Sequence, residues 1–256
     1  LDIGINKLDT ELTDFTNQFY LQTLFRNDLA LSLGVEHKKL KVTTETILST
    51  DNQDETVFEN SNYVSLFGQL KFDTYDSKYY PTEGLFFLGE ANYYMYSSDF
   101  STDFSPFSIF KAELGYAFKA TDNLSFNLVT DGGFKINPKA NQFLDFVLGG
   151  YGNNFINNFK PFYGYDFLSI AADSYIKASI NLDYQFVPKN HLMVTANYAN
   201  VSDRLFDTTD WLSLPEYSGY ALGYSFDSFL GPIEARYSYS PETRDSYWLF
   251  NLGYWF

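Results

Sequence analysis

The chain has 256 residues and a formal net charge of −15, contains no cysteine, and is 20% aromatic. The absence of cysteine excludes disulfide scaffolds, thiolate zinc sites and cysteine nucleophiles. The acidic balance argues against a nucleic-acid partner, because clustered Lys and Arg neutralise phosphates in such complexes. No apolar run approaches the ~18 residues that a membrane helix needs. Because aromatic residues favour strands, we expect an all-β chain. We expect no metal and no other cofactor.

Polar and apolar residues alternate along most of the chain, and this period of two is typical of β-strands. In 175–186, for example, Ile176, Ala178 and Ile180 share one face and Lys177 lies on the other. About twelve segments show the pattern, most of them near the ~9–11 residues with which a tilted strand crosses a bilayer. In chain order they are 1–6, 15–26, 29–38, 63–72, 85–96, 110–118, 124–134, 175–186, 192–198, 220–226, 232–240 and 246–256.

The connections between these segments alternate in length. Long polar loops are expected at 39–61, 97–106, 135–173 and 201–215. Short turns are expected at 27–28, 121–123, 187–190 and 227–231. Short connections at one end and long ones at the other are typical of a transmembrane up-and-down barrel, whose turns face the periplasm.

A soluble antiparallel sandwich or a lipocalin-like barrel also alternates with a period of two. Such a fold would turn its apolar faces inward. Apolar faces on about twelve strands would then need a large, dry, aromatic-lined interior. In a membrane barrel the same faces meet lipid, and aromatic residues near strand ends, such as Phe118, Phe186 and Tyr239, fit the interfacial girdles. We therefore predict a transmembrane, antiparallel, up-and-down β-barrel.

The segment 68–94 contains a strand that ends at Asp73, a turn that includes Pro81 and Gly84, and a second strand. Proline presets one turn dihedral angle and glycine supplies a positive one, which explains both residue types. This order resembles the bacterial surface antigen superfamily, the BamA-like outer-membrane barrels, in which a similar turn joins two central strands.

Further motifs of the same resemblance follow in order along the chain. Gly149 and Gly150 end a string that resembles the family's lead into its inward-folded loop, and Tyr254 with Phe256 resembles the aromatic C-terminal signal that the outer-membrane assembly machinery reads. The family's barrels have about sixteen strands. When these motifs are aligned with the family's order, the strands of this chain correspond to about the last twelve. The resemblance implies one barrel domain over 1–256, the C-terminal part of a longer protein, with its long loop at about 135–173.

The loop string 158–167 and the Asn- and Tyr-rich style resemble the barrel that follows the patatin-like phospholipase domain in envelope proteins of Bacteroidetes-type bacteria. The resemblance implies a place in the outer membrane of a Gram-negative bacterium, with membrane lipids and the assembly machinery, through the C-terminal strand, as partners. A homodimer or larger complex is compatible with it. We expect a barrel that anchors or translocates such a phospholipase; a protein translocation or assembly factor and a passive porin are the alternatives.

One departure from the family lies in the long loop. Tyr163, Gly164 and Tyr165 stand where the family carries Arg-Gly-Phe/Tyr, and the family's arginine reaches a charged partner on the barrel wall. An aromatic residue takes the place of that arginine here. The departure argues against protein-insertion or translocation activity. We expect the long loop to fold into the lumen as a plug, with Gly149, Gly150, Tyr163, Gly164 and Tyr165 as its candidate residues.

Catalytic residues are not expected in this chain. It has no Gly-x-Ser-x-Gly nucleophile elbow, which a patatin-like hydrolase requires, and the Asp-Gly-Gly string at 131–133 falls within a strand. His191 is expected beside a turn and in contact with water, and neither His191 nor His37 is expected to meet a serine together with an orienting residue. Charged residues on the polar faces are expected to line the lumen and satisfy one another: Glu36, Lys38, Glu90, Lys111, Glu113, Asp131, Lys177, Asp183, Glu234 and Arg236.

Overall fold

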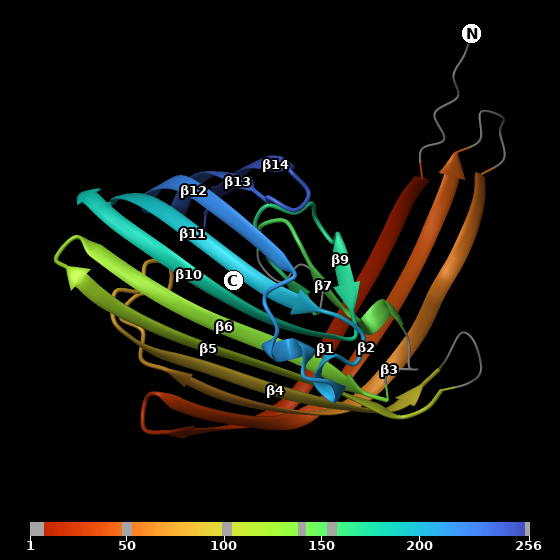
Figure 1. The fold of residues 1–256 in the computed structure, drawn as a ribbon. Coiled ribbons are helices and arrows are strands. Elements are labelled where there is room, and N and C mark those ends of the chain that lie inside the picture. Colours follow the sequence, from red (N-terminus) through yellow and green to blue (C-terminus); the bar gives the residue numbers. More distant parts are fainter. Residues whose placement is uncertain (1–7, 48–52, 99–103, 138–141, 153–157, 254–256) are drawn as a thin grey trace, which may run out of the picture.

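A computed structural model describes residues 8–47, 53–98, 104–137, 142–152 and 158–253. Eleven strands form one antiparallel sheet, in which each strand pairs with the next one along the barrel (Figure 1). In sheet order they are β1 (Leu8–Phe25), β2 (Leu29–Ile47), β3 (Gln53–Asp73), β4 (Gly84–Ser97), β5 (Phe107–Thr121), β6 (Leu124–Ile136), β10 (Ser174–Val187), β11 (Asn190–Val201), β12 (Tyr217–Ser228), β13 (Gly231–Tyr239) and β14 (Ser246–Leu252). The predicted all-β, antiparallel, up-and-down fold is confirmed.

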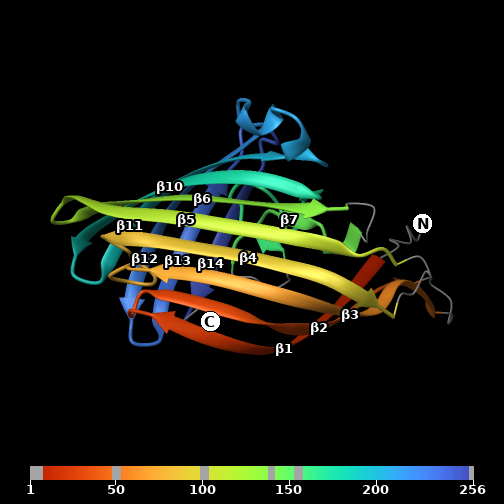
Figure 2. The same cartoon turned by 90° about the horizontal axis from the view of Figure 1, so that it is seen from below.

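The sheet curls into a wide trough (Figure 2). In the described part of the chain β1 and β14 are the two edges and do not pair with each other, so the sheet is an open, partial barrel. The strand that the alternation predicts at 1–6 lies outside the described residues. An unpaired edge in a bilayer leaves backbone groups without hydrogen-bond partners, and both edges therefore need a further partner in the membrane.

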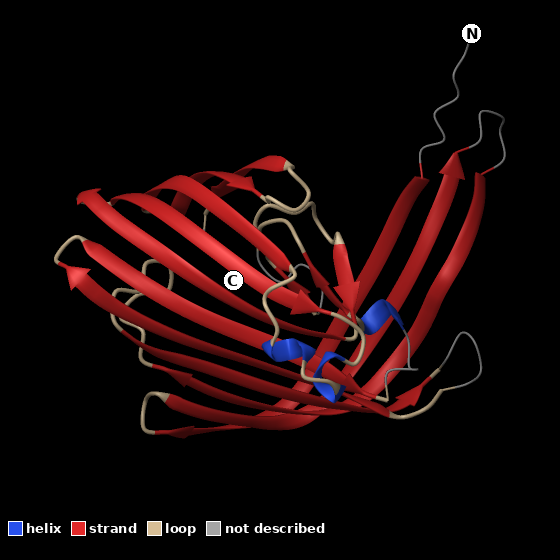
Figure 3. Cartoon of the chain, in the orientation of Figure 1, coloured by secondary structure: helices blue, strands red, loops and turns tan. Residues whose placement is uncertain are grey.

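The first hairpins are longer than the sequence pattern indicated. A loop was expected at 39–61, whereas β2 continues to Ile47 and β3 begins at Gln53. The expectation was wrong because the lysines of this segment alternate with apolar residues, as a strand requires: Leu40 is 1% exposed and Val42 is 7% exposed. The helical elements of the described residues are three short 3-10 turns, drawn in blue in Figure 3. Within the described residues no helix is long and apolar enough to cross a membrane.

The two faces of the sheet differ in polarity. On β2, Leu33 and Val35 point outward and are 58% and 44% exposed, whereas Glu36 and Lys38 point inward and are buried. In a membrane barrel the exposed apolar face lies against lipid. Ion pairs run along the inward face: Lys38 with Asp14 (2.6 Å), Lys111 with Glu90 (2.9 Å) and Lys177 with Asp131 (3.0 Å). Several inward charges thus neutralise one another across neighbouring strands.

The described residues between β6 and β10, which we call the inward loop, lie on the concave side of the sheet (Figures 1 and 2). The inward loop contains the 3-10 turn η1 (Gln142–Leu144) and three short strands, β7 (Phe146–Leu148), β8 (Phe159–Lys160) and β9 (Ile170–Ala172). These strands form a small sheet in which β7 pairs in parallel with β8 and antiparallel with β9. The long connection predicted at 135–173 therefore carries structure of its own.

Candidate functional site

The turn between β3 and β4 brings the predicted turn residues together. Asp73 ends β3, and its carboxylate accepts a hydrogen bond from the backbone N–H of Tyr75 (3.2 Å). Gly84 begins β4 with φ +117°, and an ideal Cβ there would lie 2.2 Å from the carbonyl oxygen of Thr74. Pro81 lies between them and lines the lumen. Glycine is needed at position 84 because both its dihedral angle and its surroundings exclude a side chain.

Asp76 organises the same turn. Its carboxylate accepts hydrogen bonds from the backbone N–H (2.8 Å) and the hydroxyl (2.6 Å) of Thr82, and from the backbone N–H of Glu83 (3.1 Å). Partial burial raises the pKa of the Asp76 carboxyl, but the hydrogen bonds from Thr82 and Glu83 outweigh it and leave this pKa below its usual value of 3.8. Since a lowered folded-state pKa stabilises the charged form, the turn keeps this support at neutral pH and loses it as the pH falls through the lowered pKa.

We expect Asp76→Ala to loosen the turn at neutral pH. The amide hydrogens of Thr82 and Glu83 should exchange roughly fivefold faster, because each loses a charge-assisted hydrogen bond at an exposed position. The difference between the variant and the wild type should shrink when the pH is lowered below the pKa of Asp76. Asp122→Ala, in the exposed β5–β6 turn, is the matched control and should leave both amides unchanged; equal effects of the two substitutions would contradict this role of Asp76.

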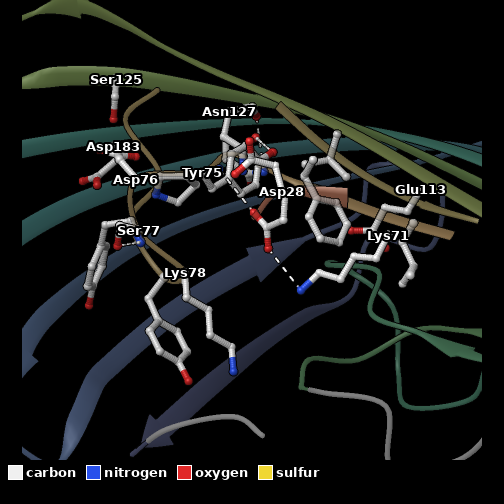
Figure 4. A pocket seen from close by; sticks show the side chains of 18 of the residues that line it. Asp28, Lys71, Tyr75, Asp76, Ser77, Lys78, Glu113, Ser125, Asn127 and Asp183 are labelled. Carbon is white, nitrogen blue, oxygen red and sulfur yellow. Dashed lines mark hydrogen bonds and ion pairs between the residues drawn. The ribbon is translucent and has the colours of Figure 1, made fainter. Parts of the chain in front are cut away.

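Two tyrosines point from the turn into the lumen. The hydroxyl of Tyr75 donates a hydrogen bond to the side-chain oxygen of Asn127 on β6 (2.8 Å; Figure 4). Gly115 on β5 makes room for it, because an ideal Cβ there would lie 2.0 Å from that hydroxyl. Burial is the main cause that raises the pKa of Tyr80 to about 12. Tyr80 is therefore neutral at physiological pH and interacts with the wall as a neutral hydrogen-bonding group.

His191 does not lie in water, contrary to the expectation from the sequence. It is 5% exposed, its Nδ1 is 2.8 Å from a carboxylate oxygen of Asp183, and its ring stacks on Tyr80 with centroids 4.0 Å apart. Ser225 is its cross-strand partner on β12. The hydroxyl of Ser225, however, shares hydrogen bonds with Tyr80 and with Glu234 (3.3 Å). Strand alternation already placed Asp183, His191 and Ser225 on polar faces, but the register that joins them was not evident.

The backbone of the inward loop depends on its two predicted glycines. Gly149 has φ +132° and Gly150 has φ +65°, and an ideal Cβ on Gly149 would lie 2.0 Å from the carbonyl oxygen of Asp166. These tight contacts let the short strands of the loop pack over an apolar core. Its buried members within the loop are Leu144, Phe146, Leu148, Phe162, Tyr165, Ile170 and Ala172.

The Tyr163-Gly164 step of the loop lies directly against the barrel wall. The backbone N–H of Tyr163 donates to the side-chain oxygen of Asn197 on β11 (2.9 Å), and the Asn197 amide donates back to its carbonyl (3.4 Å). Gly219 on β12 allows this approach, because an ideal Cβ there would lie 1.8 Å from the Tyr163 carbonyl oxygen. Gly164, with φ +85°, also passes close to β13, because an ideal Cβ there would lie 2.7 Å from the carbonyl oxygen of Tyr239. The loop is therefore seated on three neighbouring strands.

A buried arginine of the wall holds the aromatic residues of the loop. The guanidinium of Arg236 on β13 lies 5.5 Å from the ring centroid of Tyr163 and 5.7 Å from that of Tyr151, and bonds to Glu234 (3.2 Å). The hydroxyl of Tyr151 donates to the other carboxylate oxygen of Glu234. We call these four residues the Arg236 clamp. The cation thus stands on the wall and the aromatic residues stand in the loop, a relation that the sequence alone did not reveal.

Two further contacts fasten the inward loop. Nζ of Lys160 on β8 lies 3.4 Å from a carboxylate oxygen of Glu113 on β5. Burial lowers the pKa of Lys160, but the negative charges of Asp131 and Glu113 outweigh it and raise this pKa above its usual value, so the lysine is charged. On the other side Tyr165 donates to Glu242 (3.1 Å) in the β13–β14 connection. The loop thus bridges the lumen from β5 to β13.

A cavity of about 1120 Å³ remains between the β3–β4 turn and the inward loop (Figure 4). Charges of both signs and aromatic rings line it, including Lys71, Asp73, Tyr80, Glu113, Tyr163 and Arg236. Of the residues predicted from the sequence, Asp73 and Pro81 of the turn and Tyr163 of the loop line this cavity. The predicted C-terminal signal, Tyr254 and Phe256, lies outside the described residues; β14 before it turns Trp248 and Phe250 outward, 67% and 74% exposed.

Comparison with known proteins agrees with this architecture. A family model described as the OMP85 superfamily matches residues 1–256. Among solved structures, BamA from Haemophilus ducreyi lacking POTRA domains 1–3 is similar, with a TM-score of 0.63 and 13% sequence identity. The match covers 92% of this chain and 51% of that one, so the chain spans about half the length of that structure. No curated protein matched the sequence.

The two positive comparisons carry different weight. At 13% identity the likeness to BamA shows the fold alone, whereas the family model covers the entire sequence. Together they confirm the resemblance to BamA-like barrels and the predicted location. The chain therefore belongs to the OMP85 superfamily and is a BamA-like barrel of the Gram-negative outer membrane.

Proposed function

We propose that this chain is the outer-membrane barrel that anchors a patatin-like phospholipase domain, and that the inward loop closes its lumen. The observation that carries the proposal is the double attachment of the loop, through Lys160 to Glu113 on β5 and through Tyr163 to Arg236 on β13. Such buried attachments favour a static plug over a passive porin. The likeness of the loop string 158–167 to barrels linked to patatin-like domains supports a patatin-like phospholipase as the anchored domain.

In this proposal the barrel itself does no chemistry. Its sequence has no nucleophile elbow, and the hydroxyl of Ser225, the serine opposite His191, is hydrogen-bonded to Tyr80 and Glu234. Hydrolysis would belong to a domain outside this chain. The outward apolar face would contact membrane lipids, and the C-terminal strand would be the segment that the outer-membrane assembly machinery receives.

We expect the complete gene product to hydrolyse phospholipid and Ser225→Ala to retain that activity, because Ser225 is a fully buried wall residue. Fatty-acid release from detergent-dispersed phospholipid is the measurement, and the heat-dependent gel mobility typical of folded barrels checks the variant. Loss of hydrolysis in a folded Ser225→Ala variant would assign the chemistry to the barrel. If the complete product releases no fatty acid, the anchor proposal is wrong and the alternative below takes its place.

The second candidate is a translocation or assembly factor that passes polypeptide through or beside the barrel. The cavity of about 1120 Å³ favours it, because this space adjoins the loop and opens beside the β3–β4 turn. The fold likeness to BamA is compatible with both candidates. The two candidate functions differ in whether the inward loop moves away from the barrel wall. That movement would begin with loss of the contacts in the Arg236 clamp.

A further inference from the structure

Residues 202–216, between β11 and β12, form a compact loop that we call the outer foot. It contains the turns η2 (Leu205–Asp207) and η3 (Asp210–Leu212). Asn200, 7% exposed at the end of β11, donates to the carbonyl oxygen of Asp210 (3.3 Å) and accepts from the backbone N–H of Glu216 (2.8 Å). Leu205 is 3% exposed and fixes the first turn in place. Hydrogen bonds and a buried leucine therefore hold the foot in a defined conformation.

The outer foot lies on the convex side of the sheet, opposite the inward loop (Figure 2). The ring of Phe206 packs edge-on against Phe134, with centroids 5.6 Å apart. Phe134 belongs to the outward row of β6, the row that faces lipid in this family of barrels. The ring of Trp211 in turn lies 6.0 Å from Phe206. The foot thus folds down onto the lipid-facing wall.

Apolar side chains of the foot are turned away from the protein. Leu214 is 90% exposed and Leu212 is 68% exposed, and Trp211 beside them is 36% exposed. Such a cluster in water costs free energy in proportion to its apolar area. At a membrane–water interface the same residues are favourable, and tryptophan is enriched there.

The barrel wall next to the foot is also apolar. Phe206 lines an apolar groove of about 540 Å³ on the outer surface of β3 to β6. Its floor is a row of small outward residues, Gly89, Ala112 and Gly132, paired across neighbouring strands. The groove is continuous with the lipid-facing wall of the barrel. The foot therefore adjoins the part of the surface that contacts lipid in a membrane barrel.

We propose that the outer foot inserts Trp211, Leu212 and Leu214 into the outer leaflet of the membrane and so fixes the depth and tilt of the barrel at this side. The described charges of the foot are four carboxylates and one arginine, so attraction to anionic headgroups does not drive the insertion. Burial of apolar area drives it, and salt should have little effect. Because only the outer-membrane location is used, the inference holds for either candidate function.

The test uses Trp211 as a probe in the complete protein. Phe replaces Trp248, Trp255 and any tryptophan outside this sequence, and the protein is folded into vesicles of phosphatidylcholine with or without bromine on the acyl chains. We expect brominated lipid to quench Trp211 emission about twofold or more, and aqueous iodide to quench it weakly, with no change between low and high salt. The reciprocal variant, Trp211→Phe with Trp255→Phe, keeps Trp248 on the outward face of β14 and is the positive control.

Strong iodide quenching of Trp211 without bromolipid quenching, in vesicles where Trp248 is quenched by bromolipid, would overturn the proposal. The foot would then stand in water and be available to a protein partner instead. A second measurement covers the case in which the tryptophan variants do not fold. Because the chain has no cysteine, Leu214→Cys gives a single site for a polarity-sensitive dye, and the dye should shift to the blue in vesicles; emission typical of water would likewise refute insertion.

Discussion

Replacing the clamp arginine, Arg236→Met, should release the inward loop and open the lumen. Arg236 and Glu234 are 7% and 8% exposed, so the substitution leaves a buried carboxylate without its cation and should lower the free energy of unfolding by about 3 kcal/mol. The loop also loses the contacts of the guanidinium with Tyr151 and Tyr163. A desolvated cation–π contact is worth about 2 kcal/mol, which corresponds to a roughly thirtyfold larger population with the loop displaced.

Planar-bilayer recordings of the complete protein are the measurement for this loop release. The wild type should show rare openings, and Arg236→Met frequent or lasting ones. Lys71→Met is the matched control, because Lys71 lines the same cavity and pairs with Asp73 in an exposed position (3.1 Å), where an ion pair contributes at most about 1 kcal/mol. Arg236→Lys should fall between the two, since a lysine keeps the charge but not the planar stacking. Equal conductance in Arg236→Met and Lys71→Met would show that the clamp does not hold the loop.

Adding a side chain at Gly219 should displace the same loop by a steric clash. In Gly219→Val the new Cβ would lie 1.8 Å from the carbonyl oxygen of Tyr163 and 2.7 Å from the Asn197 amide nitrogen. One of these contacts is to backbone, so the loop must move, and overpacking of this kind costs about 3 kcal/mol. Urea unfolding and proteolysis of the loop should both report the change.

Gly68→Ala is the control for the Gly219 substitution. Gly68 also lies within a central strand, but it faces outward, and its new Cβ would meet only the end of the Leu33 side chain at 3.2 Å. A small effect is expected there. Since Gly219 and Arg236 act on the same residue, Tyr163, the double variant should be less destabilised than the sum of the single variants. If the free-energy changes of the two substitutions were strictly additive, Gly219 and Arg236 would not act on the same loop.

The sequence by itself determined the class of structure and the polarity of its faces. A period of two in segments such as 175–186 implies strands whose side chains alternate between two environments, and an apolar face along nearly every strand requires lipid on that side. Motifs that depend on local backbone geometry, such as Gly84 in its turn and Gly149 in the loop, were recognised for the same reason. Their dihedral angles admit few other residues.

Only the tertiary structure decided which residues meet across the lumen. Alternation assigns Arg236 and Glu234 to the inward face, but it cannot show that the loop brings Tyr163 and Tyr151, more than seventy positions away, over the guanidinium. The buried contact of His191 with Asp183 escaped prediction for the same reason. The physical cause is general: each residue's face follows from the local geometry of its own strand, whereas its neighbours follow from the register of the sheet and the path of the loop, which depend on the whole fold.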